Sequence, residues 1–240
     1  MGKAKKSALK LLPPDWRESI WAVASTPEWR QSRPQLLPAL AMLWLTGCRP
    51  AELEQGIELV TRSDQIVVKI TGAKCVDAGG RERGQPTRHI GFRIDADANP
   101  ALRFLHALAA RNAVDGQGRC TITHNRDYLY NSVVALGRSA FPKLRTRISP
   151  YCFRHQVASD LKAATSDRDI TLEQAAKFMG HLSDYSIGAY GHAAHGRKGR
   201  SGRVKVPFVS TARPVKHSPK VDRLMRFKRA SAVRRKHESR

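Results

Sequence analysis

Two arginines, a histidine and a tyrosine in this chain have the chemistry needed to break a phosphodiester bond without a metal ion. Tyr190 lies nine residues after His181, and Arg49 and Arg154 precede both. A tyrosine hydroxyl can act as a covalent nucleophile when nearby cations share its developing negative charge. A planar guanidinium stays charged at any working pH and can donate two parallel hydrogen bonds to phosphate oxygens. These residue types therefore predict phosphoryl transfer through a covalent tyrosine intermediate, provided that the fold brings them together.

The sequence around these residues contains three motifs. The first is T-G-C-R-P-A-E-L around Arg49, the second is Y-C-F-R-H around Arg154, and the third is G-H at His181, with Tyr190 nine residues beyond it. In this order and at this separation, the motifs resemble those of the tyrosine recombinases, the DNA integrase family. That family's pattern is T-G-x-R-x-x-E-L, a lysine on a β-hairpin, H-x-x-R-H, G-H and a tyrosine nine residues after that histidine.

The resemblance implies a role for each side chain. Tyr190 would attack the phosphorus atom and form a 3′-phosphotyrosyl link, while Arg49 and Arg154 would neutralise charge on the non-bridging oxygens. His181 would donate a hydrogen bond to a non-bridging oxygen or to the tyrosine. Glu52 would orient Arg49 or cap a helix. Outside such motifs, a tyrosine is more often a packing residue, an arginine a surface residue, and a histidine after a glycine part of a helix end.

Three assignments leave alternatives open. Lys74 corresponds to the family's hairpin lysine, which delivers a proton to the departing 5′ oxygen, and Lys69 is the competing choice. Tyr151 stands where the family has a histidine; a phenol can donate a hydrogen bond but is a poor general base at neutral pH. Tyr185 competes weakly with Tyr190 as the nucleophile because it lies close to the G-H motif. The expected catalytic residues are Arg49, Lys74, Tyr151, Arg154, His181 and Tyr190.

Periodicity predicts an α+β, mostly helical fold with a small antiparallel sheet. The resemblance implies that this is the tyrosine-recombinase catalytic fold. Helices are predicted at 15–24, 34–45, 99–113, 126–139, 150–164 and 172–179. β-Branched runs predict strands at 57–61, 65–71 and 87–94, and residues 115–118 are predicted as a loop. Pro50 is expected to open a further helical turn, which leaves Arg49 at a junction between two helices.

Composition divides the chain into three parts. Residues 1–14 are basic and broken by prolines, which predicts a flexible arm, and residues 15–192 carry the resemblance to the catalytic domain. Residues 193–240 form a basic tail with sixteen Lys or Arg against two acids, expected to be extended or disordered to about residue 218. The end of the tail, over 221–236, is either a basic amphipathic helix, which in the family often docks onto a neighbouring protomer, or a solvated disordered segment.

The net charge indicates the class of partner, and the apolar runs and cysteines indicate the compartment. The formal net charge is +23, with 43 Lys and Arg against 20 Asp and Glu, which predicts a polyanionic partner, with nucleic acid favoured over a membrane surface. The longest apolar run, 36–45, is too short to span a bilayer and contains Pro38, and no signal peptide is visible. The four cysteines form no C-x-x-C pair and have no metal-ligand spacing, which suits a reducing compartment. We therefore expect a cytoplasmic, nucleoid-associated protein.

The resemblance implies a site-specific DNA recombinase or integrase that needs no metal, ATP or other cofactor. Its partners would be double-stranded DNA and further copies of the chain, four at a synapse, with accessory directionality factors as a further partner class. One rival is a type IB topoisomerase, and another is a DNA-binding or architectural relative without turnover, suggested by Tyr151. The family's N-terminal clamping domain has no counterpart before the catalytic helices, so we expect either a minimal recombinase or part of a longer protein.

Overall fold

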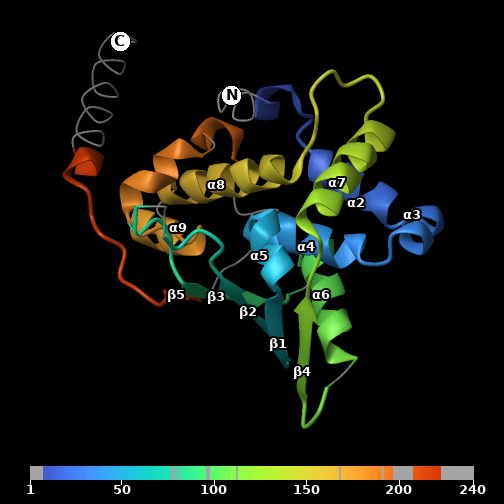
Figure 1. Ribbon diagram of the computed structural model, residues 1–240, viewed down its shortest axis with the longest axis horizontal. Helices are drawn as coiled ribbons and strands as arrows, with labels where there is room; N and C mark the ends of the chain where they lie inside the picture. The colour runs from blue at the N-terminus through green and yellow to red at the C-terminus, as the bar shows by residue number, and fades with distance from the viewer. Residues whose placement is uncertain are drawn as a thin grey trace.

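The computed structural model describes residues 8–76, 79–80, 82–95, 98–111, 113–167, 169–190, 192–196 and 208–222. They form an α+β fold in which helices pack on a small antiparallel sheet (Figure 1). The α-helices are α2 (Trp16–Ala24), α3 (Pro27–Ser32), α4 (Leu36–Thr46), α5 (Pro50–Gln55), α6 (Pro100–Ala110), α7 (Arg126–Ala140), α8 (Pro150–Ser166) and α9 (Leu172–Phe178). The 3₁₀ helices are η1 (Leu9–Leu11), η2 (Asp184–Ala189) and η3 (Ala193–His195). The strands are β1 (Ile57–Arg62), β2 (Gln65–Thr71), β3 (Thr87–Arg93), β4 (Gln117–Ile122) and β5 (Phe208–Thr211).

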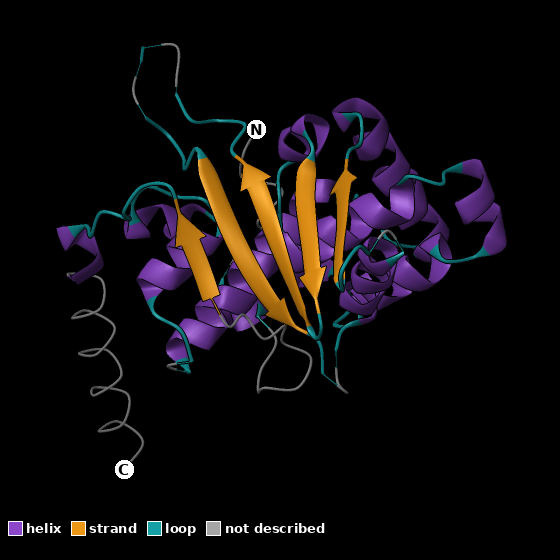
Figure 2. Cartoon of the chain, turned by 90° about the horizontal axis from the view of Figure 1, so that it is seen from below, coloured by secondary structure: helices purple, strands orange, loops and turns teal. Residues whose placement is uncertain are grey.

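The strands lie in the order β4-β1-β2-β3-β5, and every neighbouring pair is antiparallel. Along β1 and β2, inward and outward residues alternate because successive side chains point to opposite faces of a strand. Leu59, Val68 and Ile90 lie opposite one another in the register and are buried. Figure 2 shows the helices gathered on one face of the sheet, so these residues form the sheet's side of the core.

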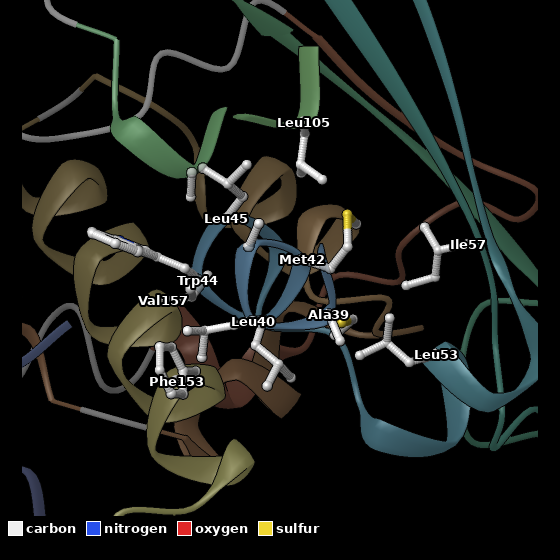
Figure 3. Close-up of a cluster of buried hydrophobic side chains, with 14 of the residues drawn as sticks. Ala39, Leu40, Met42, Trp44, Leu45, Leu53, Ile57, Leu105, Phe153 and Val157 are labelled. Atoms are coloured by element: carbon white, nitrogen blue, oxygen red, sulfur yellow. The ribbon is translucent and has the colours of Figure 1, made fainter. Parts of the chain in front are cut away.

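α4 is the centre of the helical layer. All of its residues except Pro38 are buried, as expected for a run that is apolar on every side. Figure 3 shows its side chains beside Phe153 and Val157 of α8. The helix ends at Gly47, which has a φ of +58° and leaves room for only a hydrogen at Cα, since a Cβ would lie 3.0 Å from Val157 Cβ. No helix in the described part of the chain is both long and apolar enough to cross a membrane.

Most predicted elements are present close to their predicted bounds, but α3 and β4 are additions to the prediction. The helix predicted at 99–113 ends at Ala110, and the predicted loop at 115–118 runs directly into β4. The loop prediction relied on glycines as turn residues. Gly118 instead lies within β4, where a Cβ would be 2.3 Å from the Ala109 carbonyl oxygen. The glycine therefore allows α6 to pack closely on β4.

The described parts of the predicted arm and tail include residues that pack on the rest of the fold. In the arm, Leu9 and Leu12 are buried in the core, because removing apolar surface from water lowers the free energy of the folded state. In the tail, β5 pairs with β3, whose edge would otherwise leave backbone groups unpaired. Residues 219–222 form a helical turn, and the rest of the helix predicted at 221–236 lies outside the described residues.

Candidate active site

His181 is held by the C-terminal end of α9. A capping box between Thr171 and Gln174 starts the helix. The helix ends at Gly180, whose φ is +71°, with hydrogen bonds from the Gly180 N–H to the Lys177 carbonyl (3.0 Å) and from the His181 N–H to the Ala176 carbonyl (2.9 Å). This glycine-terminated turn reverses the chain at the helix end. It directs His181 into the interior, where the residue is 4% exposed.

Arg154 joins the end of α4 to the end of α9. It is buried, and its terminal nitrogens donate hydrogen bonds to the carbonyls of Gly47 (2.8 Å) and Met179 (2.9 Å). Burial and the charge of Arg49 lower its pKa to about 10, so the guanidinium is still protonated at neutral pH. Its Nε has no hydrogen-bond partner among the residues that the structure describes. Arg154 therefore combines a structural role with a charge held in the interior.

Arg49 is the N-cap residue of α5, and Glu52 contacts it twice. The Arg49 backbone N–H donates to Glu52 Oε2 (2.8 Å), which caps the helix, and Arg49 Nη1 donates to Glu52 Oε1 (2.7 Å), which orients the side chain. Both contacts expected of Glu52 are therefore present. Burial alone would raise the pKa of Glu52, but Arg88 and Arg49 outweigh this effect and lower it to about 2. Arg88, which the sequence analysis did not select, is thus the second partner of a buried carboxylate.

Tyr190, the residue after η2, lies among these groups. Its ring stacks on that of His181 with centroids 5.3 Å apart, and Arg154 Cζ lies 4.7 Å from the tyrosine ring centroid. Burial alone would raise the pKa of the phenol, but the positive charges of Arg154 and Arg49 outweigh burial and lower the pKa. Burial alone would also lower the pKa of Arg49, but Glu52 and Tyr190 raise it. The structure therefore brings Arg49, Arg154, His181 and Tyr190 together.

His181 is a neutral imidazole in this environment. Burial and the charges of Arg154, Arg49 and Arg88 lower its pKa to about 2. Within the described part of the chain, neither ring nitrogen has a hydrogen-bond partner. A neutral imidazole has one N–H donor, so His181 can donate a hydrogen bond without adding a charge. Buried polar groups are normally partnered, and an unpartnered pair of ring nitrogens is what we expect beside a site that receives a hydrogen-bonding ligand.

Lys74 is the outermost member of the predicted set. It is exposed in the loop between β2 and β3. A Cβ at Gly84, in the same loop, would lie 2.9 Å from the Lys74 carbonyl oxygen and 3.3 Å from the Gly180 carbonyl oxygen, so the loop packs on the turn before the histidine. Lys69, the competing choice, is paired with Glu58 (2.8 Å) on the outer face of the sheet. Lys74 therefore lies in the loop that packs on the turn before His181, and its side chain is exposed.

Tyr151 and His155 share α8 with Arg154. Tyr151 is half-buried in the first turn of the helix. His155, the last residue of the Y-C-F-R-H motif, is 9% exposed, and its ring centroid lies 5.5 Å from that of Tyr190. An imidazole therefore lies beside the tyrosine even though position 151 carries a phenol. Its place directly after Arg154 in the motif was the signal for it.

Polar residues on α8 bind the backbone at positions 190 and 192. Lys162 Nζ donates a hydrogen bond to the Tyr190 carbonyl, and the Ser159 hydroxyl accepts one from the His192 N–H (3.1 Å). Ser159 and Lys162 are three residues apart, so they lie on neighbouring turns of one helix face. Polar residues that recur on a mostly buried helix indicate contacts with other polar groups, and this pattern in the sequence could have identified Ser159 and Lys162.

A C-terminal strap, residues 208–222, braces the same loops. Buried Gln85 donates from Nε2 to the carbonyls of His181 (3.2 Å) and Arg213 (2.9 Å), and its Oε1 accepts from the Arg213 N–H (3.0 Å). The N–H of Asp184, the first residue of η2, donates to a strap carbonyl (3.2 Å). The strap therefore contacts both the turn that holds the histidine and the 3₁₀ helix that leads to the tyrosine.

The strap is expected to dock more weakly at alkaline pH. His217 Nδ1 lies 2.6 Å from Asp184 Oδ2, and its Nε2 lies 3.0 Å from Asp222 Oδ2. Hydrogen bonds to Asp222 and Asp184 raise the pKa of His217 above 6.5. A pKa raised in the folded state means that this stabilisation is fully present below about pH 6.5 and is lost as the pH rises through the raised value.

Trypsin cleavage after Lys216, which lies directly before His217, measures this docking. Relative to a peptide substrate, cleavage should be faster at about pH 8.5 than at about pH 6. His217→Gln, which cannot become charged, should remove the difference. Equal relative rates at the two pH values for the unmodified protein would show that the imidazolium does not hold the strap.

Comparisons of the chain with protein-family models, characterised proteins and solved structures found no match. The arrangement of the residues is therefore the basis for inferring function. Three guanidinium groups, those of Arg49, Arg88 and Arg154, lie around one carboxylate, that of Glu52. They leave two positive charges beside the Tyr190 phenol, which is a suitable environment for an anionic ligand.

Proposed function

We propose that this protein is a tyrosine recombinase with that family's catalytic fold, which cuts one strand of duplex DNA with Tyr190 and rejoins it to a partner strand. The observation that supports this most strongly is the interaction of Tyr190 with both Arg49 and Arg154. The two guanidiniums that stabilise the phenolate carry the positive charge and the paired N–H donors that bind a phosphate. They come from the two motifs that the resemblance pairs with this tyrosine.

Strand cleavage would be a displacement at phosphorus. Tyr190 Oη loses its proton to solvent and attacks the phosphorus atom, and the bond from phosphorus to the 5′ oxygen breaks. Lys74 supplies the proton that the leaving 5′ hydroxyl takes, and the 3′ phosphate stays bonded to the tyrosine. Attack by the 5′ hydroxyl of a second strand reverses these steps and releases the enzyme. Because the link conserves the phosphodiester bond, no external energy source is consumed.

Arg49, Arg154 and His181 would stabilise the transition state. As attack proceeds, negative charge builds on the non-bridging oxygens, and preorganised donors in a buried site stabilise it strongly. The neutral imidazole of His181 adds a donor without raising the local charge. Without DNA, the Tyr190 phenol interacts with the guanidiniums, so DNA binding would exchange that phenol for the scissile phosphate.

Duplex DNA is the proposed partner, together with further copies of the chain at a synapse. The net charge of +23 supports a polyanionic ligand. Contacts to backbone phosphates release counterions, so affinity should fall steeply as salt rises. Four copies would hold two duplexes, so that each cut strand meets its partner.

Covalent trapping tests the proposal. Duplexes with a randomised sequence and a nick beside the scissile position lose a short 5′ fragment on cleavage, which prevents rejoining and traps the protein on DNA. We expect an SDS-resistant adduct in EDTA, because no step uses a metal. Binding to the same pool is measured in parallel. A protein that binds the pool but forms no adduct on any duplex would contradict the enzymatic proposal and support a DNA-binding role.

Plasmid relaxation, compared with strand exchange, distinguishes the recombinase from a type IB topoisomerase. At low protein concentration a topoisomerase relaxes a supercoiled plasmid as a monomer, whereas a recombinase exchanges strands between two copies of the selected site. We expect exchange that depends on protein concentration and little relaxation by the monomer. Rapid relaxation without exchange would favour the topoisomerase.

Tyr151 is the observation that favours a catalytically weak relative. Tyr151→His is expected to speed adduct formation by about tenfold, because an imidazole can transfer protons near neutral pH whereas a phenol cannot. Tyr151→Phe is the matched control and should not increase the rate. Equal rates for the histidine and phenylalanine variants would show that position 151 takes no part in proton transfer.

A further inference from the structure

Arg88 is a charged side chain on the inward face of β3, where the strand pattern calls for an apolar residue. It shares that face with Ile90 and Phe92 and is 1% exposed. It donates a bidentate pair of hydrogen bonds to Glu52, from Nη1 to Oε1 (3.1 Å) and from Nη2 to Oε2 (2.9 Å). A buried ion pair is seldom the most stable choice for a core position, since apolar side chains of similar volume often stabilise as much or more. A function for the pair is therefore worth seeking.

Arg88 fixes the plane of the Glu52 carboxylate. Each carboxylate oxygen accepts one hydrogen bond from Arg88 and one from Arg49, so the two arginines hold opposite sides of one buried group. A planar fork is well suited to hold a carboxylate in one orientation. The orientation that Arg88 imposes presents Oε1 to Arg49 Nη1, which directs the Arg49 side chain to Tyr190.

Arg88 also sets the charge that Arg49 has available. One carboxylate paired with one guanidinium is neutral, whereas one carboxylate shared by two guanidiniums leaves a positive charge. In addition, the Arg88 guanidinium lies against the turn before His181, because a Cβ at Gly180 would be 2.7 Å from Arg88 Nη1. Arg88 thus contacts two parts of the site. One is the Glu52 carboxylate, which orients Arg49, and the other is the turn that carries His181.

We propose that Arg88 is a positioning residue for the reaction: by holding Glu52, it directs Arg49 at Tyr190 and leaves Arg49 free charge for the phosphate. This inference rests on the proposed function for its catalytic consequence. Its structural consequence, the interaction of Arg49 with the phenol, exists without DNA. The two can therefore be tested separately.

The test compares Arg88→Lys with Arg93→Lys. Arg93 lies on the same strand and pairs with Asp64 (2.9 Å), but it is exposed on the outer end of the sheet, which makes it a matched control. Lysine keeps the charge but cannot make the bidentate contact. We expect Arg88→Lys to slow single-turnover adduct formation at saturating DNA by about 100-fold, with DNA affinity within about threefold of the unmodified protein. Arg93→Lys should change neither quantity.

A second readout needs no activity. Tyrosine labelled with ¹³C at Cζ reports the ionisation of the Tyr190 phenol by NMR, assigned with Tyr190→Phe. Arg88→Lys should raise the phenol pKa, because Arg49 moves away from it, and Arg93→Lys should not. An unchanged titration in Arg88→Lys would overturn the positioning role whether or not the protein cleaves DNA. A changed titration in a protein that forms no adduct would instead retain the positioning role and reject the recombinase.

A neutral double variant guards against loss of folding. Arg88→Gln alone would leave a buried carboxylate short of one cation, whereas Glu52→Gln combined with Arg88→Gln removes both charges of the pair. We expect the double variant to fold, as judged by circular dichroism, and to cleave about 100-fold more slowly. Cleavage at the unmodified rate by this variant would overturn the inference.

Discussion

Tyr190→Phe is expected to abolish the covalent protein–DNA adduct, by more than about a thousandfold, while leaving DNA affinity within about threefold. Phenylalanine lacks the nucleophilic oxygen but keeps the ring that stacks on His181 at 5.3 Å. The packing of the site should therefore survive. The measurement is the SDS-resistant adduct on the nicked duplex, with binding measured by fluorescence anisotropy.

Tyr185→Phe is the matched control for that loss. Tyr185 is 52% exposed on η2, four residues after His181, and was the weak competitor for the nucleophile. We expect this variant to form adduct at the unmodified rate. If Tyr190→Phe retained an adduct that a further Tyr185→Phe change removed, the nucleophile would be Tyr185 and the proposed geometry would be wrong.

Arg154→Ala is expected to have the second largest effect, a loss of about a thousandfold in adduct formation. It is also expected to destabilise the fold, because the buried carbonyls of Gly47 and Met179 lose their donors, at about 1–3 kcal/mol each. Assays should therefore be run well below the melting temperature of the variant. Thermal unfolding gives the stability and single-turnover cleavage gives the rate.

The pH dependence separates the charge of Arg154 from its packing. Burial raises the pKa of the Tyr190 phenol and Arg154 is the foremost group that lowers it, so removing Arg154 should raise that pKa. The rise of cleavage rate with pH should then move to higher pH. Arg17→Ala is the control, since Arg17 is also buried and paired, with Asp160 at 2.8 Å, but on α2. If Arg154→Ala kept the unmodified pH profile, the guanidinium would act by packing alone.

Local features of the site could be predicted from the sequence because they depend on neighbouring residues. Gly180 ends α9 and so places His181, and Pro50 opens α5 and so leaves Arg49 at its N-cap, both by short-range backbone geometry. Glu52 lies three residues after Arg49, which is the spacing of a helix cap. Such contacts form as soon as the helix forms and do not depend on how the helix packs in the fold.

Long-range partners could not be predicted in the same way. Arg88 reaches Glu52 from a strand that is distant in sequence, and its place in an alternating strand gave no hint of a buried charge. Pairing of β5 with β3 depends on a sheet edge that only the folded sheet creates. His155 was visible in its motif, but its distance from Tyr190 follows from how α8 packs against Tyr190 and η3.

Mapping the attachment point of DNA tests the central claim most directly. Digestion of the trapped adduct with nuclease and trypsin, followed by mass spectrometry, identifies the residue that carries the 3′-phosphonucleotide. The convergence of Arg49, Arg154 and Tyr190 predicts that the nucleotide is on Tyr190. A nucleotide on any other residue, or an adduct that lacks a phosphotyrosine, would contradict it.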